Sequence, residues 1–396
     1  LGSAGPQIRV DYGDINLTAA GTISGATFAL TLGGSGIGSL SSIIGTTTGT
    51  VTKIGTGTWT LSGASTFTGA VTVNRGTLKL GATGGVTNTP FGTSAGGVSV
   101  LSGAVLDLNG FTLANTVTFE ALTINGRGID DGGAIVNSGG ALTYSGAVAQ
   151  ATDSRITNSG GGLLTFSGAV SGAFALYVGG TANTTFGIAI PTNGLALTKQ
   201  GVGTLTLTGT NLNNGIIRVD AGTLMYGAAT TLAAPNLTMN GGTFNMNAAT
   251  DTIGVVILVD GTISNGTLTA TTSYTLEKGT ISAILAGAVA FTKNTNNTVT
   301  LTGANTMSST TTINAGTLVL SGSGSAVSST MTVNLGGTLT LNNSTTAVAS
   351  RLGDALALTL NGGNFNFIGN SAGVSSETAG ALTLPTGHNT ITVTPG

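Results

Sequence analysis

Three aspartates and two arginines form the densest group of ionisable side chains in this sequence. Asp130 and Asp131 are adjacent, Asp153 follows after a short interval, and Arg127 and Arg155 flank them. Two carboxylates and an arginine, if brought together, suffice for glycoside hydrolysis or calcium-dependent lyase chemistry. The same residues also suit a turn with solvated charges. We favour the turn, because "GRGIDDGGA" lacks the nonapeptide spacing of a calcium-binding repeat.

The other reactive side chains are isolated. His388, the sole histidine, lies in "PTGHNT" with no triad or metal-ligand pattern, so we expect a surface loop. Lys53, Lys199 and Lys293 recur in similar phrases but are too far apart to form a row, and we expect solvated edge positions. The absence of cysteine excludes disulfides, thiolate zinc sites and a cysteine nucleophile. We therefore expect no catalytic residue, no cofactor and no metal site, and a protein that is not an enzyme.

Composition narrows the possible partners. Only 6% of the residues are charged, and the formal net charge is −2, which supplies no basic stripe for nucleic acid. A weakly charged surface does little to prevent self-association. The longest apolar patch, Ala283 to Phe291, is too short for a membrane span. The start at Leu1, without a cationic segment and an apolar core, suggests a processed or excised chain.

One phrase occurs three times. It reads "TKIGTGTWTLSGASTF" from Thr52, "TKQGVGTLTLTGTNLN" from Thr198 and "TKNTNNTVTLTGANTM" from Thr292. Apolar residues alternate with polar ones, which indicates short strands with one buried face. The residues expected to face inward are Trp59, Leu61, Val71, Val73, Leu78 and Leu80 in copy 1, Leu205, Leu207, Ile217, Val219, Leu224 and Tyr226 in copy 2, and Val299, Leu301, Thr311, Ile313, Leu318 and Leu320 in copy 3.

The joints between strands are also regular. An asparagine or aspartate stands two positions before a glycine, which suits a turn that needs positive φ. The glycines concerned are Gly76, Gly222 and Gly316. Shorter echoes of the same unit, such as "LTLNGGNFNF" from Leu358, recur between the copies and give a period of about 20 to 27 residues.

A unit of this length cannot bury its apolar face alone, whereas stacked units share one core. The sequence therefore predicts an all-β fold, a right-handed parallel β-helix of about 15 to 18 coils. We expect a solenoid over residues 19–388. Residues 1–18 and 389–396 should be terminal strand segments, the first with an inter-subunit contact.

The stretch "GTGTWTLSGASTFTGAVTVNRGTLKL", Gly55 to Leu80, resembles the passenger-associated transport repeat of autotransporter passengers and related bacterial surface proteins. The other two copies carry the same skeleton. The resemblance implies a secreted β-helical protein at the bacterial cell surface or outside the cell. The amphipathic strands of an autotransporter translocator do not follow, and the chain ends "LPTGHNTITVTPG".

Two side-chain patterns have a bearing on function. Thr-x-Thr pairs invite comparison with ice-binding β-helices, but those need such pairs on adjacent coils, and the neighbouring echoes carry "FNM" and "FNF". We therefore expect no ice-binding surface. Asparagines at strand ends are expected to stack into structural, hydrogen-bonded ladders. The pairs are Thr58 with Thr60, Thr204 with Thr206 and Thr298 with Thr300, and the asparagines are Asn74, Asn240, Asn314, Asn334 and Asn361.

Three functions remain open. The first is a bacterial extracellular structural protein that self-assembles head to tail into a filament, fibre or sheath through strand edges, with itself as partner. The second is a monomeric adhesin that binds polysaccharide or a cell surface. The third, which we favour least, is a polysaccharide lyase or hydrolase. We expect neither nucleic acid nor a membrane span.

Overall fold

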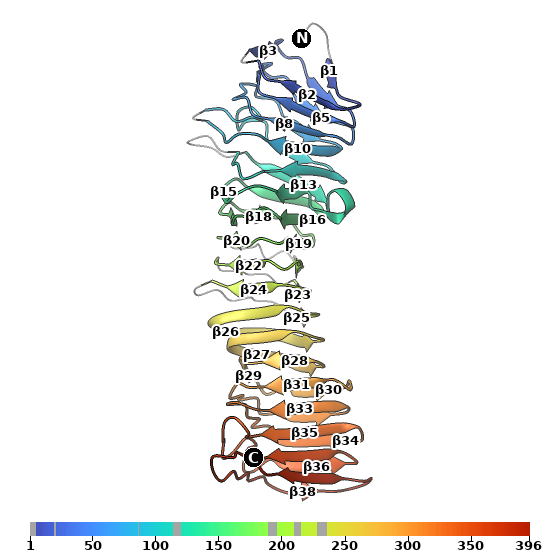
Figure 1. Cartoon of the computed structure of the whole chain (residues 1–396), viewed down its shortest axis with the longest axis vertical. Coiled ribbons are helices and arrows are strands. Elements are labelled where there is room, and N and C mark those ends of the chain that lie inside the picture. The colour runs from blue at the N-terminus through green and yellow to red at the C-terminus, as the bar shows by residue number, and fades with distance from the viewer. Residues whose placement is uncertain are drawn as a thin grey trace. The chain divides into compact units, whose positions relative to one another are not determined.

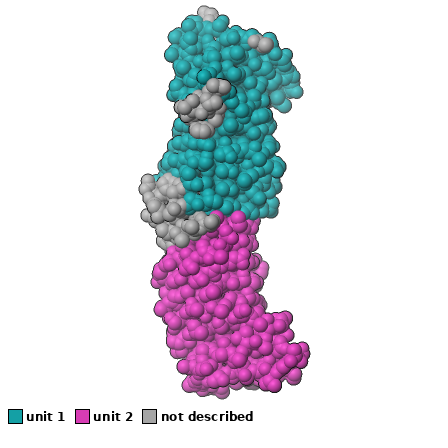
Figure 2. Space-filling model, turned by 90° about the vertical axis from the view of Figure 1, so that its left-hand side faces the viewer, with its two compact units in different colours: residues 1–213 teal, residues 214–396 magenta. Residues whose placement is uncertain are grey.

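The computed structural model describes residues 5–19, 21–85, 87–113, 120–188, 196–209, 215–227 and 236–396. The strands pair in parallel and stack as an all-β solenoid of about 17 turns, which confirms the predicted fold class and coil number. Figure 1 shows successive strands of each part of the chain lying one above another. The chain divides into two compact units, unit 1 (Leu1–Asn213) and unit 2 (Asn214–Gly396), coloured separately in Figure 2.

The strands of unit 1 follow three faces, A, B and C, on which each strand pairs with strands of neighbouring coils. Face A contains β1 (Gln7–Arg9), β4 (Leu30–Gly33), β7 (Val51–Lys53), β9 (Val71–Val73), β11 (Val98–Val100), β13 (Leu122–Gly126), residues 148–150 of β16 (Val148–Asn158), and β18 (Val170–Ser171). Face B contains β2 (Asp14–Leu17), β5 (Ile37–Leu40), β8 (Thr58–Leu61), β10 (Gly76–Leu80), β12 (Ala104–Asp107), β14 (Ile135–Asn137), residues 154–158 of β16, β19 (Leu176–Gly179) and β21 (Leu197–Lys199). Face C contains β3 (Thr22–Ser24), β6 (Ile43–Gly45), β15 (Leu142–Tyr144), β17 (Leu164–Phe166), β20 (Thr184–Phe186) and β22 (Thr204–Leu207). One helical turn, η1 (Ile129–Asp131), lies between β13 and β14 in the chain.

The strands of unit 2 follow faces D, E and F, and two long strands bend around all three. Face D contains β23 (Ile217–Val219), β25 (Asn236–Met239), residues 255–258 of β26 (Thr243–Leu258), residues 273–276 of β27 (Thr262–Leu276), β30 (Ala290–Lys293), β32 (Thr310–Ile313), β34 (Thr330–Asn334), β36 (Ala357–Asn361) and β38 (Leu382–Thr383). Face E contains β24 (Thr223–Tyr226), residues 243–245 of β26, residues 262–264 of β27, β28 (Gly279–Ile281), β31 (Thr298–Leu301), β33 (Gly316–Leu320), β35 (Gly337–Asn342), β37 (Asn364–Ile368) and β39 (Thr390–Thr394). Face F contains residues 249–253 of β26, residues 267–270 of β27, and β29 (Ile284–Ala286).

The core consists of the inward half of each strand. All the residues predicted to face inward in the three copies are buried, because a period of two sends alternate side chains to one side of the sheet. Trp59 is fully buried, and its Nε1 donates a hydrogen bond to the Gly33 carbonyl oxygen at 3.0 Å. The coil next to it carries Gly38, where a Cβ atom would lie 2.5 Å from the indole ring. The large side chain on one coil thus requires a glycine on the next.

Stacked aromatic rings fill part of face C. Tyr144 and Phe166 are paired in register on β15 and β17, and Phe166 pairs with Phe186 on β20. The ring centroids are 6.1 Å and 5.3 Å apart, within the range of favourable aromatic contacts. In-register stacking therefore places like residues on like residues, which explains why similar coils recur along the chain.

The predicted turn glycines adopt the expected conformation. Gly76, Gly222 and Gly316 have φ angles of 71°, 66° and 68°, a region that favours glycine. At Gly76 space is also limiting, because a Cβ atom would lie 2.7 Å from Nζ of Lys53.

Both terminal segments contain strands that stack on the next coil inward. In the N-terminal segment, β1 pairs with β4 and β2 pairs with β5. Near the other end of the chain, β39 pairs with β37. The strands predicted in these segments are therefore part of the terminal coils.

Candidate functional site

The cluster around Asp131 is an ion-pair network. Asp131 Oδ1 lies 2.5 Å from Arg127 Nε, and its Oδ2 lies 2.8 Å from Arg155 Nη1. The Arg127 guanidinium also stacks over the Tyr177 ring at 3.8 Å, a cation–π contact. Both oxygens of this carboxylate are thus engaged by arginines at a partly exposed turn.

The other two aspartates of the group, Asp153 and Asp130, have different surroundings from Asp131. Asp153 accepts a hydrogen bond from the Ala175 backbone N–H at 2.9 Å. Asp130 lies in η1 with a φ of 47° and is exposed. Among the described residues, no three histidine, aspartate or glutamate side chains converge on a possible metal site. His388 is exposed, as predicted. The contacts of Asp131 and Asp153 are those of a charged turn.

The three aligned lysines are buried, so the prediction of solvated edge positions was wrong. Lys53, Lys199 and Lys293 are 0%, 2% and 0% exposed. Lys53 follows Val51 by two positions, and strand alternation by itself directs its side chain inward. The general preference of lysine side chains for water does not hold at these positions, because the strand directs them inward and carbonyl oxygens meet the ammonium group.

Backbone carbonyl oxygens surround each buried ammonium group. Lys53 Nζ donates to the oxygens of Ile54, Gly55 and Arg75 at 2.8, 2.9 and 3.0 Å. The first two belong to the turn after β7, and Arg75 belongs to the turn one coil later. The lysine thus ties two successive turns together from inside the core. We call this arrangement the lysine cage.

Backbone carbonyl oxygens also surround the buried lysines of the other copies, and in copy 3 the second turn belongs to the preceding coil. Lys199 Nζ donates to the carbonyl oxygens of Gln200 and Gly201 at 2.7 and 2.6 Å. Lys293 Nζ donates to those of Glu277 and Thr295 at 3.0 and 2.6 Å.

Burial alters the acidity of these ammonium groups. It lowers the pKa of Lys53 and of Lys199 to about 8, and it lowers the pKa of Lys293, where the nearby Glu277 carboxylate opposes the shift. With a pKa of about 8, Lys53 and Lys199 are mostly protonated at neutral pH and able to donate to the carbonyl oxygens.

The repeated cage coincides with a known sequence family. The family model for the passenger-associated-transport-repeat matches residues 51–80, 197–225 and 291–320. The chain carries three passenger-associated transport repeats. The resemblance seen in the sequence is therefore confirmed. Each transport repeat contains one caged lysine and the strands around it, a feature that the resemblance did not imply. Comparison with curated proteins and with solved structures gives no significant match.

The transport repeats are not confined to one face of the solenoid. Within unit 1, the first repeat begins on β7 of face A, whereas the second begins on β21, which pairs with β19 of face B. A lysine cage can therefore form on either face, because the cage depends on its own strand and the turns beside it. The transport repeats and the solenoid fit an autotransporter passenger-like extracellular protein and suggest secretion or display at the cell surface.

An asparagine ladder follows one corner of unit 2 and contains three of the five asparagines that were predicted to stack, Asn314, Asn334 and Asn361. Asn314 donates from Nδ2 to Oδ1 of Asn294 at 2.7 Å, Asn334 donates to Asn314 at 2.7 Å, and Asn361 donates to Asn334 at 3.2 Å. Glu277 closes one end by accepting a hydrogen bond from Asn294 at 3.1 Å. These four asparagines are called the asparagine ladder below. Asn240, which was also predicted to stack, instead donates to Asp220 at 2.8 Å.

Thr310 and Thr312 stack in register on Thr330 and Thr332. The pairs singled out in the sequence, Thr58 with Thr60 and Thr298 with Thr300, stack on no second such pair, as predicted. An ice-binding surface built on them therefore lacks the required rows. Their partners in register are Ile37 with Ser39 and Thr77 with Lys79 for Thr58 and Thr60, and Thr317 with Val319 for Thr298 and Thr300.

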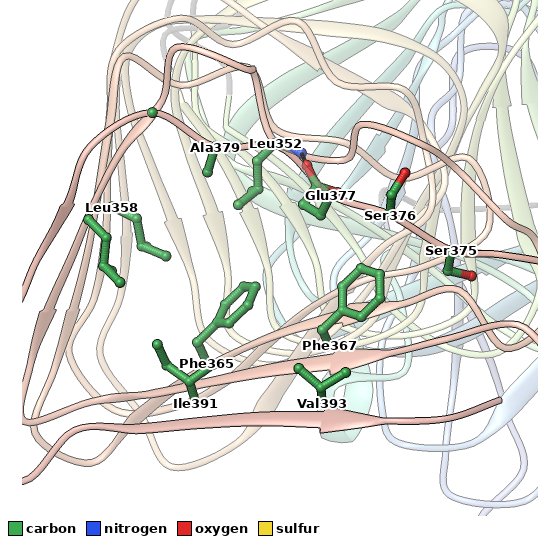
Figure 3. Close-up of a pocket in the computed structure, with 12 residues that line it drawn as sticks. Leu352, Leu358, Phe365, Phe367, Ser375, Ser376, Glu377, Ala379, Ile391 and Val393 are labelled. Carbon is green, nitrogen blue, oxygen red and sulfur yellow. Dashed lines mark hydrogen bonds between the residues drawn. The ribbon is translucent and has the colours of Figure 1, made fainter.

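An apolar cavity opens on the last coil of unit 2. It has a volume of about 400 Å³, and Figure 3 shows phenyl rings and aliphatic side chains pointing into it. We call it the end cavity. Its walls include Leu352, Leu358, Phe365, Phe367, Ile391 and Val393.

Two charged residues that the sequence analysis did not single out support this cavity. Arg351 is fully buried, and its guanidinium donates to the carbonyl oxygens of Gly324 and Thr346 at 2.7 and 2.9 Å, among others. The Glu377 carboxylate accepts the backbone N–H groups of Arg351 and Leu352 at 2.8 and 2.9 Å. Burial raises the pKa of Glu377, although these hydrogen bonds oppose the shift. The sequence contained one indication that Arg351 and Glu377 have a specific structural role, namely that charged residues are rare in this chain.

Proposed function

We propose that this chain is a bacterial extracellular structural protein that assembles head to tail into a filament, fibre or sheath. The observation that carries the proposal is the open apolar coil around the end cavity. Ile391 and Val393 point inward on β39, yet 50% and 68% of their surfaces are exposed. Exposed apolar surface of this kind is typical of an interaction site.

The strand edges at this coil support the same proposal. β37 pairs with one edge of β39, and no other described strand lies along its second edge. A free edge presents unpaired N–H and C=O groups that another strand can bind. Addition of a further coil would pair these groups and bury Ile391 and Val393 in one step.

The first coil of a second copy is the partner we propose. Ile8, Ile15 and Ile23 lie on β1, β2 and β3 and pair in register with positions on the next coil, yet they are only half-buried. Contact between this surface and the end cavity joins two different patches of the same molecule. Such a heterologous contact repeats without closing and produces a filament.

The test is electron microscopy and sedimentation of the purified chain at neutral pH and micromolar concentration. We expect filaments from the parent and discrete particles from Val393→Lys, because the substitution places a charge in the proposed interface. Thr392→Lys is the matched control, since Thr392 is exposed on the outward side of the same strand. Deletion of the residues before Thr18 should also abolish filaments while the β-sheet circular dichroism remains.

Two results would reject this function. One is a parent that stays monomeric, and the other is a Val393→Lys variant that still forms filaments. A monomeric parent would support the second candidate, an adhesin-type passenger that binds polysaccharide. A specific surface of unit 2 favours that candidate independently of assembly.

A further inference from the structure

Face D of unit 2 presents a regular column of threonines beside the asparagine ladder. On each of the strands β30, β32, β34 and β36, one outward threonine stands two positions before an asparagine of the ladder, and β32 and β34 carry a second outward threonine, Thr310 and Thr330. Parallel pairing in register aligns these threonines across four successive coils. We call them the threonine column: Thr292, Thr312, Thr332 and Thr359.

The geometry of the strands sets the spacing of this surface. Along the stack, successive coils are separated by about 4.8 Å, the distance between neighbouring strands. Across the strands, the threonine column and the asparagine ladder are about 6.6 Å apart, because two residues separate them at about 3.3 Å each. The face thus offers at least one hydroxyl group and one amide group per coil at a constant repeat.

The amide groups of the ladder are held in fixed orientation. Asn314 and Asn334 each donate one N–H to the preceding ladder member and accept one from the following member. An amide has two N–H groups and two acceptor lone pairs, so the ladder bonds leave half of this capacity for another molecule. Groups already fixed in place lose little freedom when they bind a ligand.

The part of face D formed by β30, β32, β34 and β36 is also electrically neutral on its outer side. The single ionisable residue within β30, β32, β34 and β36 is Lys293, which points into the core and is 0% exposed. Glu277, at the end of the ladder, accepts hydrogen bonds from the backbone N–H groups of Asn294 and Thr295 at 3.0 and 2.9 Å. A ligand matched to this surface offers many hydrogen-bonding groups and no charge.

We propose that the threonine column and the asparagine ladder together bind an extended neutral polysaccharide that lies along the stack. Sugar hydroxyl groups both donate and accept hydrogen bonds, as the threonine hydroxyls and asparagine amides do. A glycan chain repeats the same groups at every unit, and the face repeats its own at every coil. Binding then sums many weak contacts along the chain. The proposal concerns this face of unit 2 and does not depend on filament formation.

The experiment is depletion of the purified chain from solution by insoluble cellulose and by chitin, with polygalacturonate-coated beads as a charged comparison. A triple variant of the threonine column, which we call the lattice variant, combines Thr292→Val, Thr312→Val and Thr332→Val. These substitutions remove hydroxyl groups but keep β-branched strand residues. We expect the parent to bind one of the two neutral polymers and the lattice variant to bind at least about ten-fold more weakly, given three lost hydrogen bonds.

A matched control variant lies on face E. It combines Thr298→Val, Thr317→Val and Thr338→Val, three threonines that are also stacked in register, on β31, β33 and β35. We expect this control to bind like the parent, and circular dichroism should show the same β-sheet content for all three proteins.

Several outcomes would overturn the proposal. They are no depletion of the parent by either neutral polymer, equal binding by the parent and the lattice variant, and an equal loss in the face E control. Preferential binding to polygalacturonate would also contradict it, because a neutral face has no reason to select a polyanion. Inhibition of ice growth by the parent, without glycan binding, would instead assign the column to ordered water.

Discussion

Replacement of Lys53 by methionine tests the role of the lysine cage. Methionine keeps an unbranched side chain of similar length in the core, so the main change is the loss of the ammonium group. In the native chain this group donates to the carbonyl oxygens of Ile54, Gly55 and Arg75. After the substitution, all three oxygens lose a charged donor in a site where Lys53 was fully buried.

The size of the effect follows from these three contacts. A buried polar group left without a partner costs about 1–3 kcal/mol. The variant no longer has to bury a charge, which offsets part of that cost. We therefore expect Lys53→Met to lower the free energy of unfolding by about 3 kcal/mol, near the lower end of the sum for three carbonyl groups.

The assay combines denaturant unfolding with hydrogen–deuterium exchange. Stacked repeats unfold partly as local units, so exchange in peptides from residues 51–80 reports the affected coils directly. Lys79→Met is the matched control, because this lysine is partly exposed and pairs with Asp107 at 3.3 Å. After this substitution the Asp107 carboxylate still accepts hydrogen bonds from the backbone N–H groups of Asn109 and Ser138 and from the Ser138 hydroxyl, so we expect a smaller change there than at Lys53.

The explanation fails if Lys53→Met matches the parent within about 0.5 kcal/mol, the range typical of surface substitutions. It also fails if exchange in residues 51–80 is unchanged or if the Lys79→Met control is equally destabilised. Either result would mean that the caged ammonium contributes nothing beyond the volume of its side chain.

Three further predictions concern pH and catalysis. Burial raises the pKa of Glu120 from 4.5 to about 7, so its contribution to stability is complete below pH 4.5 and is lost as the pH rises through 7. In a plot of melting temperature against pH, the Glu120→Gln variant should therefore show a flatter curve over this range. Burial lowers the pKa of Lys199 from 10.5 to about 8, so stability should rise between pH 8 and 10.5, and Lys199→Met should remove that rise. Combined replacement of Asp130, Asp131 and Asp153 by asparagine should change nothing in assays of reducing-end release from pectin-like or glucan substrates, and activity that only the parent shows would contradict a non-catalytic protein.

Much of the fold could be predicted because its signals are local. Alternation along each strand placed Trp59 and Leu61 in the core, and the glycine two positions after Asn74 marked a turn with positive φ. The asparagine ladder was also predictable, since in-register stacking brings equivalent positions of successive coils together. The first two features need only local signals, whereas the ladder follows once the repeat length is known, because that length sets which positions of successive coils meet.

The candidate sites were less predictable, because they depend on neighbours one coil away. Whether Asp131 served chemistry or an ion pair depended on where Arg127 and Arg155 came to lie. The threonine column was missed because its members belong to four separate strands, and only the register of those strands aligns them.

The sequence by itself therefore determined the architecture of this protein. A stack with a shared core is the fold that accounts for the alternation of apolar residues, the turn glycines and the similarity of the coils. Tertiary structure decided the state of Lys53, since a buried ammonium is stable only where carbonyl oxygens from two successive turns meet it. It also decided which polar side chains form a surface, because coils of unequal length along the chain still place their strands in register. Local periodicity fixes the direction of each side chain, but only packing fixes what that side chain meets.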